Sequence, residues 1–190
     1  MTNRKVTLVL TANGRPELLK RTLDSFHKYN TYKITEELIR DDSGDSGDSG
    51  DSGDAVNHIG QIASCEELYS QVKTPFVFHC EDDWEFHKSG FIEEAFNALE
   101  DKVHSVWVRD EDDFDGHHRV KPLVNGKWVV PSPISRGFSF NPHLFDMQYY
   151  VGFSGSEMQD GVCPEDSIGR YYMKAGLKTV WTPGYCKHIG

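Results

Sequence analysis

Two kinds of hydrophobic pattern alternate along the first hundred residues. Short, continuous apolar runs at residues 6–10 (VTLVL) and 76–79 (FVFH) are typical of strands that are buried on both faces. Between and after these runs, apolar residues recur at helical spacing. This pattern predicts a helix that begins at Pro16 and further helices at residues 64–72 and 91–99. The alternation predicts an α/β fold with a mostly parallel central sheet and helices on both faces.

The second half of the chain departs from this rhythm. Residues 120–130 place Asn125-Gly126 between apolar flanks, which predicts a small β-hairpin. Weaker patterns predict strands at residues 38–39, 105–108 and 179–181, and a helix at residues 166–175 that ends at Gly176. No linker divides the 190 residues, so we expect a single domain over residues 1–190.

Composition and charge exclude several classes of partner. Thirty Asp and Glu against twenty Lys and Arg give a net charge of −10, which argues against a nucleic acid or an anionic membrane surface as partner. No apolar run reaches the ~20 residues of a transmembrane segment, and the first residues lack a signal-peptide pattern. The four cysteines lack C-x-x-C spacing. We therefore expect reduced thiols and a cytoplasmic location.

Half of the thirty acidic residues fall into three clusters, at residues 41–54, 81–85 and 110–115. Residues 42–54 repeat Asp-Ser-Gly and contain no apolar side chain, which favours a mobile loop over a calcium-binding loop. For residues 110–115 we also expect a solvated loop. The remaining cluster differs, because Glu81-Asp82-Asp83 directly follows a predicted buried strand.

Three polar segments follow predicted strands: residues 11–15, Asp41-Asp42 and Glu81-Asp82-Asp83. The carboxyl ends of parallel strands meet at one edge of a sheet, where α/β proteins bind their ligands. Neighbouring carboxylates repel one another unless a cation compensates them. Mn²⁺ or Mg²⁺, which bridge oxygen ligands to substrate phosphates, would fit such a site. A solvated acidic turn is the alternative interpretation.

Five segments in order carry a resemblance to a known family: VTLVLTANGRPELLKRTLDSF, IRDDSGD, FVFHCEDDWEF, GFSFNPHLF and PEDSIGRYYMKAGLKTVW. Together they resemble the nucleotide-sugar glycosyltransferases of the GT-A fold, most closely the family 2 type, over nearly the whole chain. The resemblance implies a Rossmann-like GT-A domain, with residues 1–100 as its nucleotide-binding half and residues 101–190 as its acceptor and catalytic half. It also implies a UDP-sugar donor, Mn²⁺ or Mg²⁺ as cofactor, and a glycan or other hydroxyl acceptor.

The same resemblance assigns roles to individual residues. Nucleotide contacts fall on Thr11, Ala12, Arg15, Asp41, Asp42, Glu81 and Asp82. Glu81 stands where the family's D-x-D motif has its leading Asp, which leaves its own contact less defined. Metal ligation falls on Asp83 and His188, and catalysis on Asp166 with Glu165. Asp166 would act as the base of an inverting transfer, taking the proton from the attacking acceptor hydroxyl.

Other interpretations stay open. A sugar nucleotidyltransferase would open with a Gly-rich phosphate loop, whereas residues 11–15 contain one Gly. A non-catalytic calcium-binding module would also explain the acidic clusters. Arg15 could be an ordinary surface residue, and Asp166 could be an acid that stabilises a helix N-terminus. His188 lies two residues from the end, so the chain could be the first domain of a longer protein.

Overall fold

The computed structural model describes residues 4–43, 60–110, 120–122, 129–131, 138–153 and 164–190. The helices are α1 (Pro16–Tyr29), α2 (Gln61–Gln71), α3 (Phe91–Ala98) and α4 (Pro164–Lys174), with a 3₁₀ turn, η2, at Met147–Tyr149. The strands are β1 (Val6–Ala12), β2 (Ile34–Asp41), β3 (Phe76–Glu81), β4 (Trp84–Phe86), β5 (Val103–Arg109), β6 (Val120–Pro122), β7 (Val129–Pro131), β8 (His143–Asp146) and β9 (Lys178–His188).

All the strands belong to one mixed sheet, in the order β2-β1-β3-β8-β5-β9-β7-β6, and β4 pairs with β9 outside this path. β1 pairs in parallel with β2 and β3, and β5 pairs in parallel with β9. β8 lies between β3 and β5 and is antiparallel to both. The α/β single domain is therefore confirmed, but the sheet is mixed where a mostly parallel one was expected.

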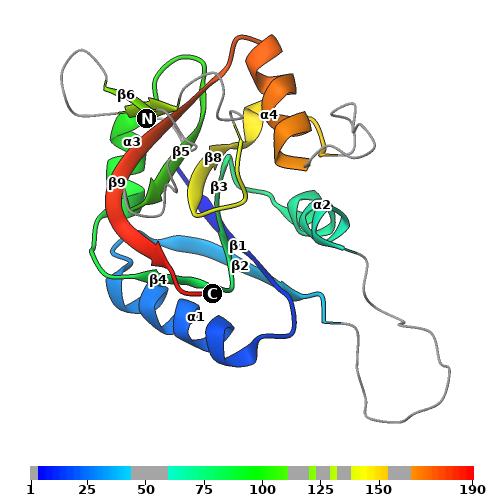
Figure 1. Cartoon of the computed structure of the whole chain (residues 1–190), viewed down its shortest axis with the longest axis vertical. Coiled ribbons are helices and arrows are strands. Elements are labelled where there is room, and N and C mark those ends of the chain that lie inside the picture. The colour runs from blue at the N-terminus through cyan, green and yellow to red at the C-terminus, as the bar shows by residue number, and fades with distance from the viewer. Residues whose placement is uncertain (1–3, 44–59, 111–119, 123–128, 132–137, 154–163) are drawn as a thin grey trace, which may run out of the picture.

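Helices cover both faces of this sheet, as the alternation of elements predicts (Figure 1). Leu8 and Leu10 of β1 pack on one face, in a core that α1 and α3 cover. Val9, between them, points to the other face and packs with α2 and α4. Successive side chains of a strand alternate between faces, so a continuously apolar strand supplies both cores.

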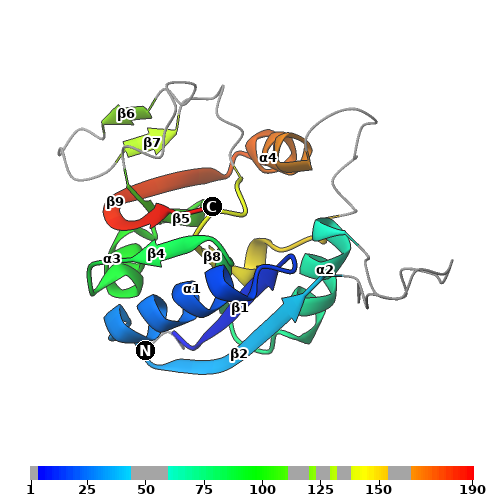
Figure 2. The ribbon, with the colours of Figure 1, turned by 60° about the horizontal axis from the view of Figure 1, so that its bottom comes forward.

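The hairpin predicted for the second half is confirmed by the antiparallel pair β6 and β7, which extends the sheet beyond β9 (Figure 2). Its turn, Asn125-Gly126, lies outside the described residues, as do residues 44–59 of the Asp-Ser-Gly segment and residues 111–119 of the third acidic cluster. None of the described helices is long and apolar enough to span a membrane.

Two histidines are buried between β3 and β8. The rings of His79 and His143 stack with their centroids 5.3 Å apart, and the two residues are register partners. His143 Nδ1 lies 2.7 Å from the Asn141 carbonyl, and the Tyr69 hydroxyl lies 3.3 Å from His79 Nδ1. Burial lowers the pKa of His143 to about 4, and burial followed by the neighbouring His143 lowers the pKa of His79 well below its ordinary value. Both rings are thus neutral in the folded protein at neutral pH.

This pair makes the fold sensitive to mild acid. Both folded-state pKa values lie below the unfolded value of about 6.5, so the stability they contribute is complete above that pH and is lost as the pH falls. For His143, the interval down to about 4 corresponds to about 3 kcal/mol of unfolding free energy. We expect urea unfolding between pH 7 and pH 5 to show this decline, with a shallower slope in His143→Phe. Equal slopes in wild type and His143→Phe would contradict the assignment.

Candidate functional site

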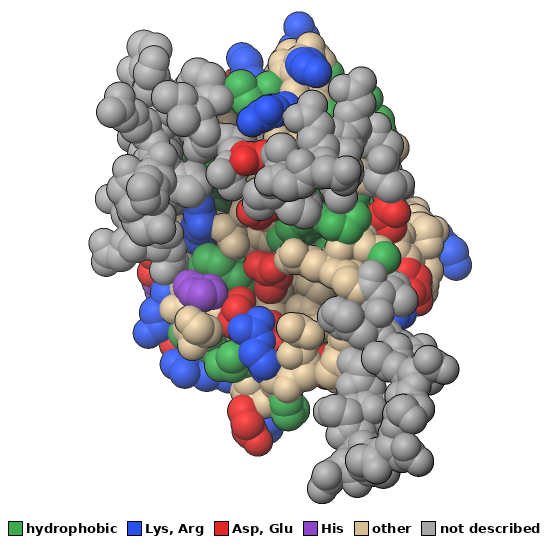
Figure 3. All heavy atoms as spheres, turned by 45° about the vertical axis from the view of Figure 1, so that its right-hand side comes forward, with side chains coloured by type: hydrophobic (Ala, Val, Ile, Leu, Met, Phe, Trp, Pro, Cys, Tyr) green, Lys and Arg blue, Asp and Glu red, His purple; other side chains and the backbone are tan. Residues whose placement is uncertain are grey.

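The carboxyl ends of β1, β2 and β3 open onto a cavity of about 240 Å³. Its lining comes from the first loop, from the residue after β2, from the start of α2 and from the end of β3: Thr11, Ala12, Asn13, Arg15, Asp42, Gln61, Ser64, Glu81 and Asp82. On the side of the molecule shown in Figure 3, acidic side chains lie beside a histidine and Lys or Arg side chains. The three segments that the sequence places at this edge do meet there.

Asp41 shapes the first loop. Its Oδ1 accepts hydrogen bonds from the backbone N–H groups of Gly14 (2.8 Å) and Ser43 (3.0 Å), and the Gly14 bond in particular lowers the pKa of Asp41. Gly14 has φ +66°, and a Cβ there would lie 2.8 Å from the Cβ of Ser43. Only glycine fits this loop without strain. Asp41 braces the loop and is not among the residues that line the cavity.

Arg15 compensates the two aspartates after β3. Its Nε donates to Asp82 Oδ2 (3.2 Å), its Nη2 donates to Asp82 Oδ1, and its Nη1 lies 2.9 Å from Asp83 Oδ2. The Asp82 side chain is 1% exposed, so its charge depends on this guanidinium and on the Asn13 N–H, which donates at 3.2 Å. Arg15 is therefore the counter-ion of the acidic cluster rather than an isolated surface residue.

Buried hydroxyls of α1 fix the backbone of the acidic turn. Thr22 Oγ1 donates to the Asp82 carbonyl (2.7 Å) and accepts from the Trp84 N–H (3.1 Å). Ser25 Oγ accepts from the Phe86 N–H (3.0 Å). These bonds satisfy a carbonyl of the turn and two N–H groups of β4 that would otherwise be buried without partners. The turn that carries Asp82 and Asp83 is therefore held rigidly against α1.

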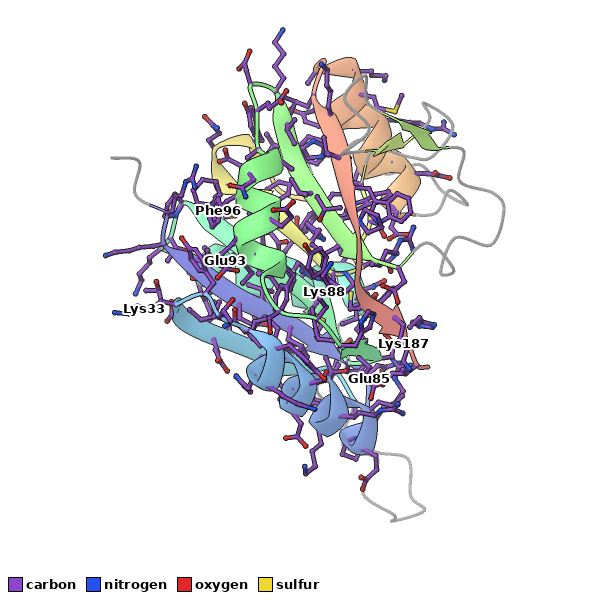
Figure 4. All side chains as sticks on the ribbon, turned by 90° about the vertical axis from the view of Figure 1, so that its left-hand side faces the viewer. Lys33, Glu85, Lys88, Glu93, Phe96 and Lys187 are labelled. Carbon is purple, nitrogen blue, oxygen red and sulfur yellow. The ribbon has the colours of Figure 1, made fainter. Side chains whose placement is uncertain are left out.

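Pairing of β4 with β9 brings His188 to the same turn. Trp84 and His188 are register partners, and His188 Nε2 lies 3.2 Å from Asp83 Oδ2. One step along the same pair, Lys187 Nζ lies 3.2 Å from Glu85 Oε2, and Figure 4 shows these two side chains at the junction of the strands. The two metal ligands expected from the sequence are thus neighbours in space.

The chemistry of this pair fits a divalent cation with additional ligands from a substrate. Asp83 Oδ1 is buried and has no hydrogen-bond partner among the described residues. An unsatisfied carboxylate oxygen beside an imidazole is a suitable pair of ligands for Mn²⁺. Within the described part of the chain, no three His, Cys, Asp or Glu side chains are grouped as a metal site. Remaining ligands would therefore come from phosphate oxygens or water.

Glu81 has an environment unlike that of its two neighbours. Burial, followed by the negative charges of Asp83 and Glu165, raises the pKa of Glu81 to about 8. Its Oε1 accepts a hydrogen bond from Gln61 Nε2 (2.7 Å). Most Glu81 side chains are therefore protonated at neutral pH, which keeps the cluster from carrying three full negative charges.

The start of α4 lies within electrostatic range of this cluster, since the Glu165 charge acts on Glu81. Glu165 Oε1 accepts from the Phe140 N–H (2.8 Å), which ties the first turn of α4 to the segment before β8. Asp166 follows in the same turn and is half-buried. Neither residue lines the cavity.

Six of the seven residues expected to contact the nucleotide line the cavity, and Asp41 is the exception. Three further lining residues, Asn13, Gln61 and Ser64, were not expected. Asn13 stands in a loop whose sequence indicates only a polar segment after a strand. Gln61 lies in the first turn of a helix that the hydrophobic pattern places three residues too late, and a Ser inside a helix gives no signal of its own.

No protein-family profile and no curated protein sequence matches the chain. GalNAc-T7, solved with UDP, GalNAc and Mn²⁺, superposes with a TM-score of 0.67 and 14% identity over 98% of this chain and 43% of that chain. The mannosyltransferase PcManGT from Pyrobaculum calidifontis, solved with GDP-Man and Mn²⁺, gives a TM-score of 0.67 and 14% identity over 97% of this chain and 56% of that chain. The chain thus spans about half the length of these two proteins. These likenesses confirm the GT-A fold.

Removal of the Arg15 charge should destabilise the fold. In Arg15→Met the buried Asp82 carboxylate loses its counter-ion, and we expect about 1–2 kcal/mol less unfolding free energy in urea, a value reduced for the partial exposure of Arg15. Arg21→Met is the matched control, because Arg21 of α1 forms a paired contact with Glu85 in an exposed position. Its loss should be clearly smaller. Equal losses in the two variants would show that Asp82 does not depend on Arg15.

Proposed function

We propose that the chain is a metal-dependent glycosyltransferase that moves a sugar from a UDP-sugar to an acceptor hydroxyl with inversion at the anomeric carbon. The observation that carries the proposal is the Asp83 carboxylate. It stands next to a polar cavity, contacts His188, and keeps a buried oxygen without a hydrogen-bond partner among the described residues.

The cavity suits a nucleoside whose phosphates extend toward Asp83. Thr11, Ala12 and Asp42 line it at the ends of β1 and β2, where GT-A proteins are expected to hold the nucleoside. Arg15 stands between the cavity and Asp83 with 40% of its side chain exposed. The guanidinium is therefore able to contact a phosphate while it still holds Asp82.

Asp83 and His188 are the residues that would hold the metal ion. When bound, a divalent ion neutralises the pyrophosphate and stabilises the charge on the departing nucleotide. The site is acidic before a ligand binds, so a pyrophosphate alone would be repelled by Asp82 and Asp83. Binding of the nucleotide and of the cation should consequently depend on each other.

Asp166 is the proposed base. It would accept the proton of the acceptor hydroxyl as that oxygen attacks the anomeric carbon, and a single displacement inverts the configuration. Glu165, bound to the Phe140 N–H, would position the first turn of α4 and hence Asp166. The two proteins of similar fold support a nucleotide-sugar donor. GalNAc-T7 was solved with UDP, GalNAc and Mn²⁺, and PcManGT was solved with GDP-Man and Mn²⁺.

Titration calorimetry of UDP with and without Mn²⁺ tests the donor site. We expect UDP to bind with Mn²⁺ and at least tenfold more weakly without it, because the cation supplies the charge that the carboxylates oppose. Asp83→Ala should abolish the metal-dependent part. Asp101→Ala, an exposed acid after α3, should bind as wild type does.

GDP in place of UDP determines whether the donor base is uracil or guanine. Ca²⁺ binding that is indifferent to every nucleotide would instead support the calcium-module interpretation and overturn the proposal. Loss of UDP binding in both Asp variants would show a general charge effect and remove the assignment of Asp83 as a ligand.

Asp166→Asn separates catalysis from donor binding. We expect UDP release from UDP-sugars in the presence of hydroxyl acceptors to fall by at least a hundredfold, while UDP affinity with Mn²⁺ stays within twofold of wild type. NMR of the product's anomeric proton reports the stereochemistry. Retained configuration, or unchanged turnover in the variant, would refute the role of Asp166.

A further inference from the structure

Ser64 has an unusual position for a buried serine. Its side chain is 0% exposed, and its Oγ has no hydrogen-bond partner among the described residues. A buried hydroxyl without a partner costs stability, and alanine at the same helical position would avoid that cost. Ser64 also lines the cavity next to Gln61 and Asp42. A ligand in the cavity could provide the missing partner.

The backbone N–H and carbonyl of Gly60 connect Asp42 to the backbone of Ser64. The Gly60 N–H donates to Asp42 Oδ2 (2.8 Å), and the Gly60 carbonyl accepts from the Ser64 N–H (2.9 Å). Gln61 and Ser64 are three residues apart on α2, so their side chains lie on the same side of the helix. A carboxylate, a hydroxyl and an amide are thus held together at the α2 end of the cavity.

These three groups differ in what they can offer a ligand. The Asp42 carboxylate accepts hydrogen bonds, the Ser64 hydroxyl can donate one, and the Gln61 amide keeps a second N–H beyond the one it gives to Glu81. Uracil presents an N–H between two carbonyl oxygens, which requires an acceptor flanked by donors. Arg15, which would contact a phosphate, and Asp83, which would hold the metal ion, form an ion pair with each other (2.9 Å).

We propose that Ser64 is a nucleobase-binding residue, whose hydroxyl donates to a uracil carbonyl while the Asp42 carboxylate accepts the adjacent N–H. Gln61 supports the same edge of the base. This assignment rests on the proposed function, because it presumes that a nucleotide occupies the cavity. It adds a determinant of base recognition on α2, a helix to which the sequence assigned no role.

The experiment compares UDP with inorganic pyrophosphate, both with Mn²⁺, in wild type and Ser64→Ala. We expect about fivefold weaker UDP binding in Ser64→Ala, the effect of one lost neutral hydrogen bond, and unchanged pyrophosphate binding. The thermal midpoint of the ligand-free variant should equal or exceed that of wild type. Ser70→Ala, in the exposed last turn of the same helix, is the matched control and should change neither affinity.

Thio-substituted UDP identifies the atom that Ser64 contacts. Sulfur accepts hydrogen bonds poorly, so 2-thio-UDP or 4-thio-UDP should bind wild type more weakly than UDP, and the same substitution should have no effect in Ser64→Ala. Such coupling in one of the two analogues would support the proposal.

Three results would overturn it. Unchanged UDP affinity in Ser64→Ala would show that the hydroxyl does not contact the base. An equal loss for UDP and pyrophosphate would show a structural effect on the whole site. If wild type binds neither UDP, GDP, CDP nor dTDP, the proposed function fails and this assignment fails with it, whereas the first two results leave the proposed function intact.

Discussion

The compensation of Asp82 and Asp83 by Arg15 is the constraint on which the arrangement of this site depends. A carboxylate that is 1% exposed destabilises a fold by several kcal/mol unless a cation and hydrogen bonds satisfy it. The cation must then stand at one place, immediately before α1, where Pro16 starts the helix. The loop that delivers it turns at Gly14 and is braced by Asp41. Much of the local fold is thus fixed by a single charge balance.

The rest of the sheet keeps this balance in place. α1 is bound to the acidic turn through Thr22 and Ser25, and β4 pairs with β9, so segments from both ends of the chain meet at Asp83. Hydrophobic cores on the two faces of the sheet hold α1 and α2 at fixed positions beside the strand ends. A site built on rigid elements in this way needs little rearrangement to receive a ligand.

The strong patterns of the sequence predicted the elements that pack on local periodicity: β1, α1, β3, α3 and the β6–β7 hairpin. The insertion of β8 between β3 and β5 could not be predicted, because strand order follows from packing between distant segments and four residues carry little periodicity. β4 was missed for the same reason. Six cavity residues were predicted because charged or loop residues at strand ends have few other roles, whereas Ser64 resembles any helical serine until its surroundings are known.

Buried polar atoms without hydrogen-bond partners among the described residues occur in two different places, the core of the fold and the candidate site. His79 and His143 are buried among aromatic side chains of the core and do not line the cavity. The cost of burying their Nε2 atoms therefore does not depend on a ligand, and burial of the two rings lowers the stability of the fold in acid. Ser64 Oγ and Asp83 Oδ1 belong to the cavity and to the carboxylate beside it. Under the proposed function a base and a cation would satisfy these two atoms, so binding would recover free energy that a fully satisfied site could not provide. The ligand-free protein is therefore less stable than it would be with both atoms hydrogen-bonded, and ligand binding as proposed would recover that difference.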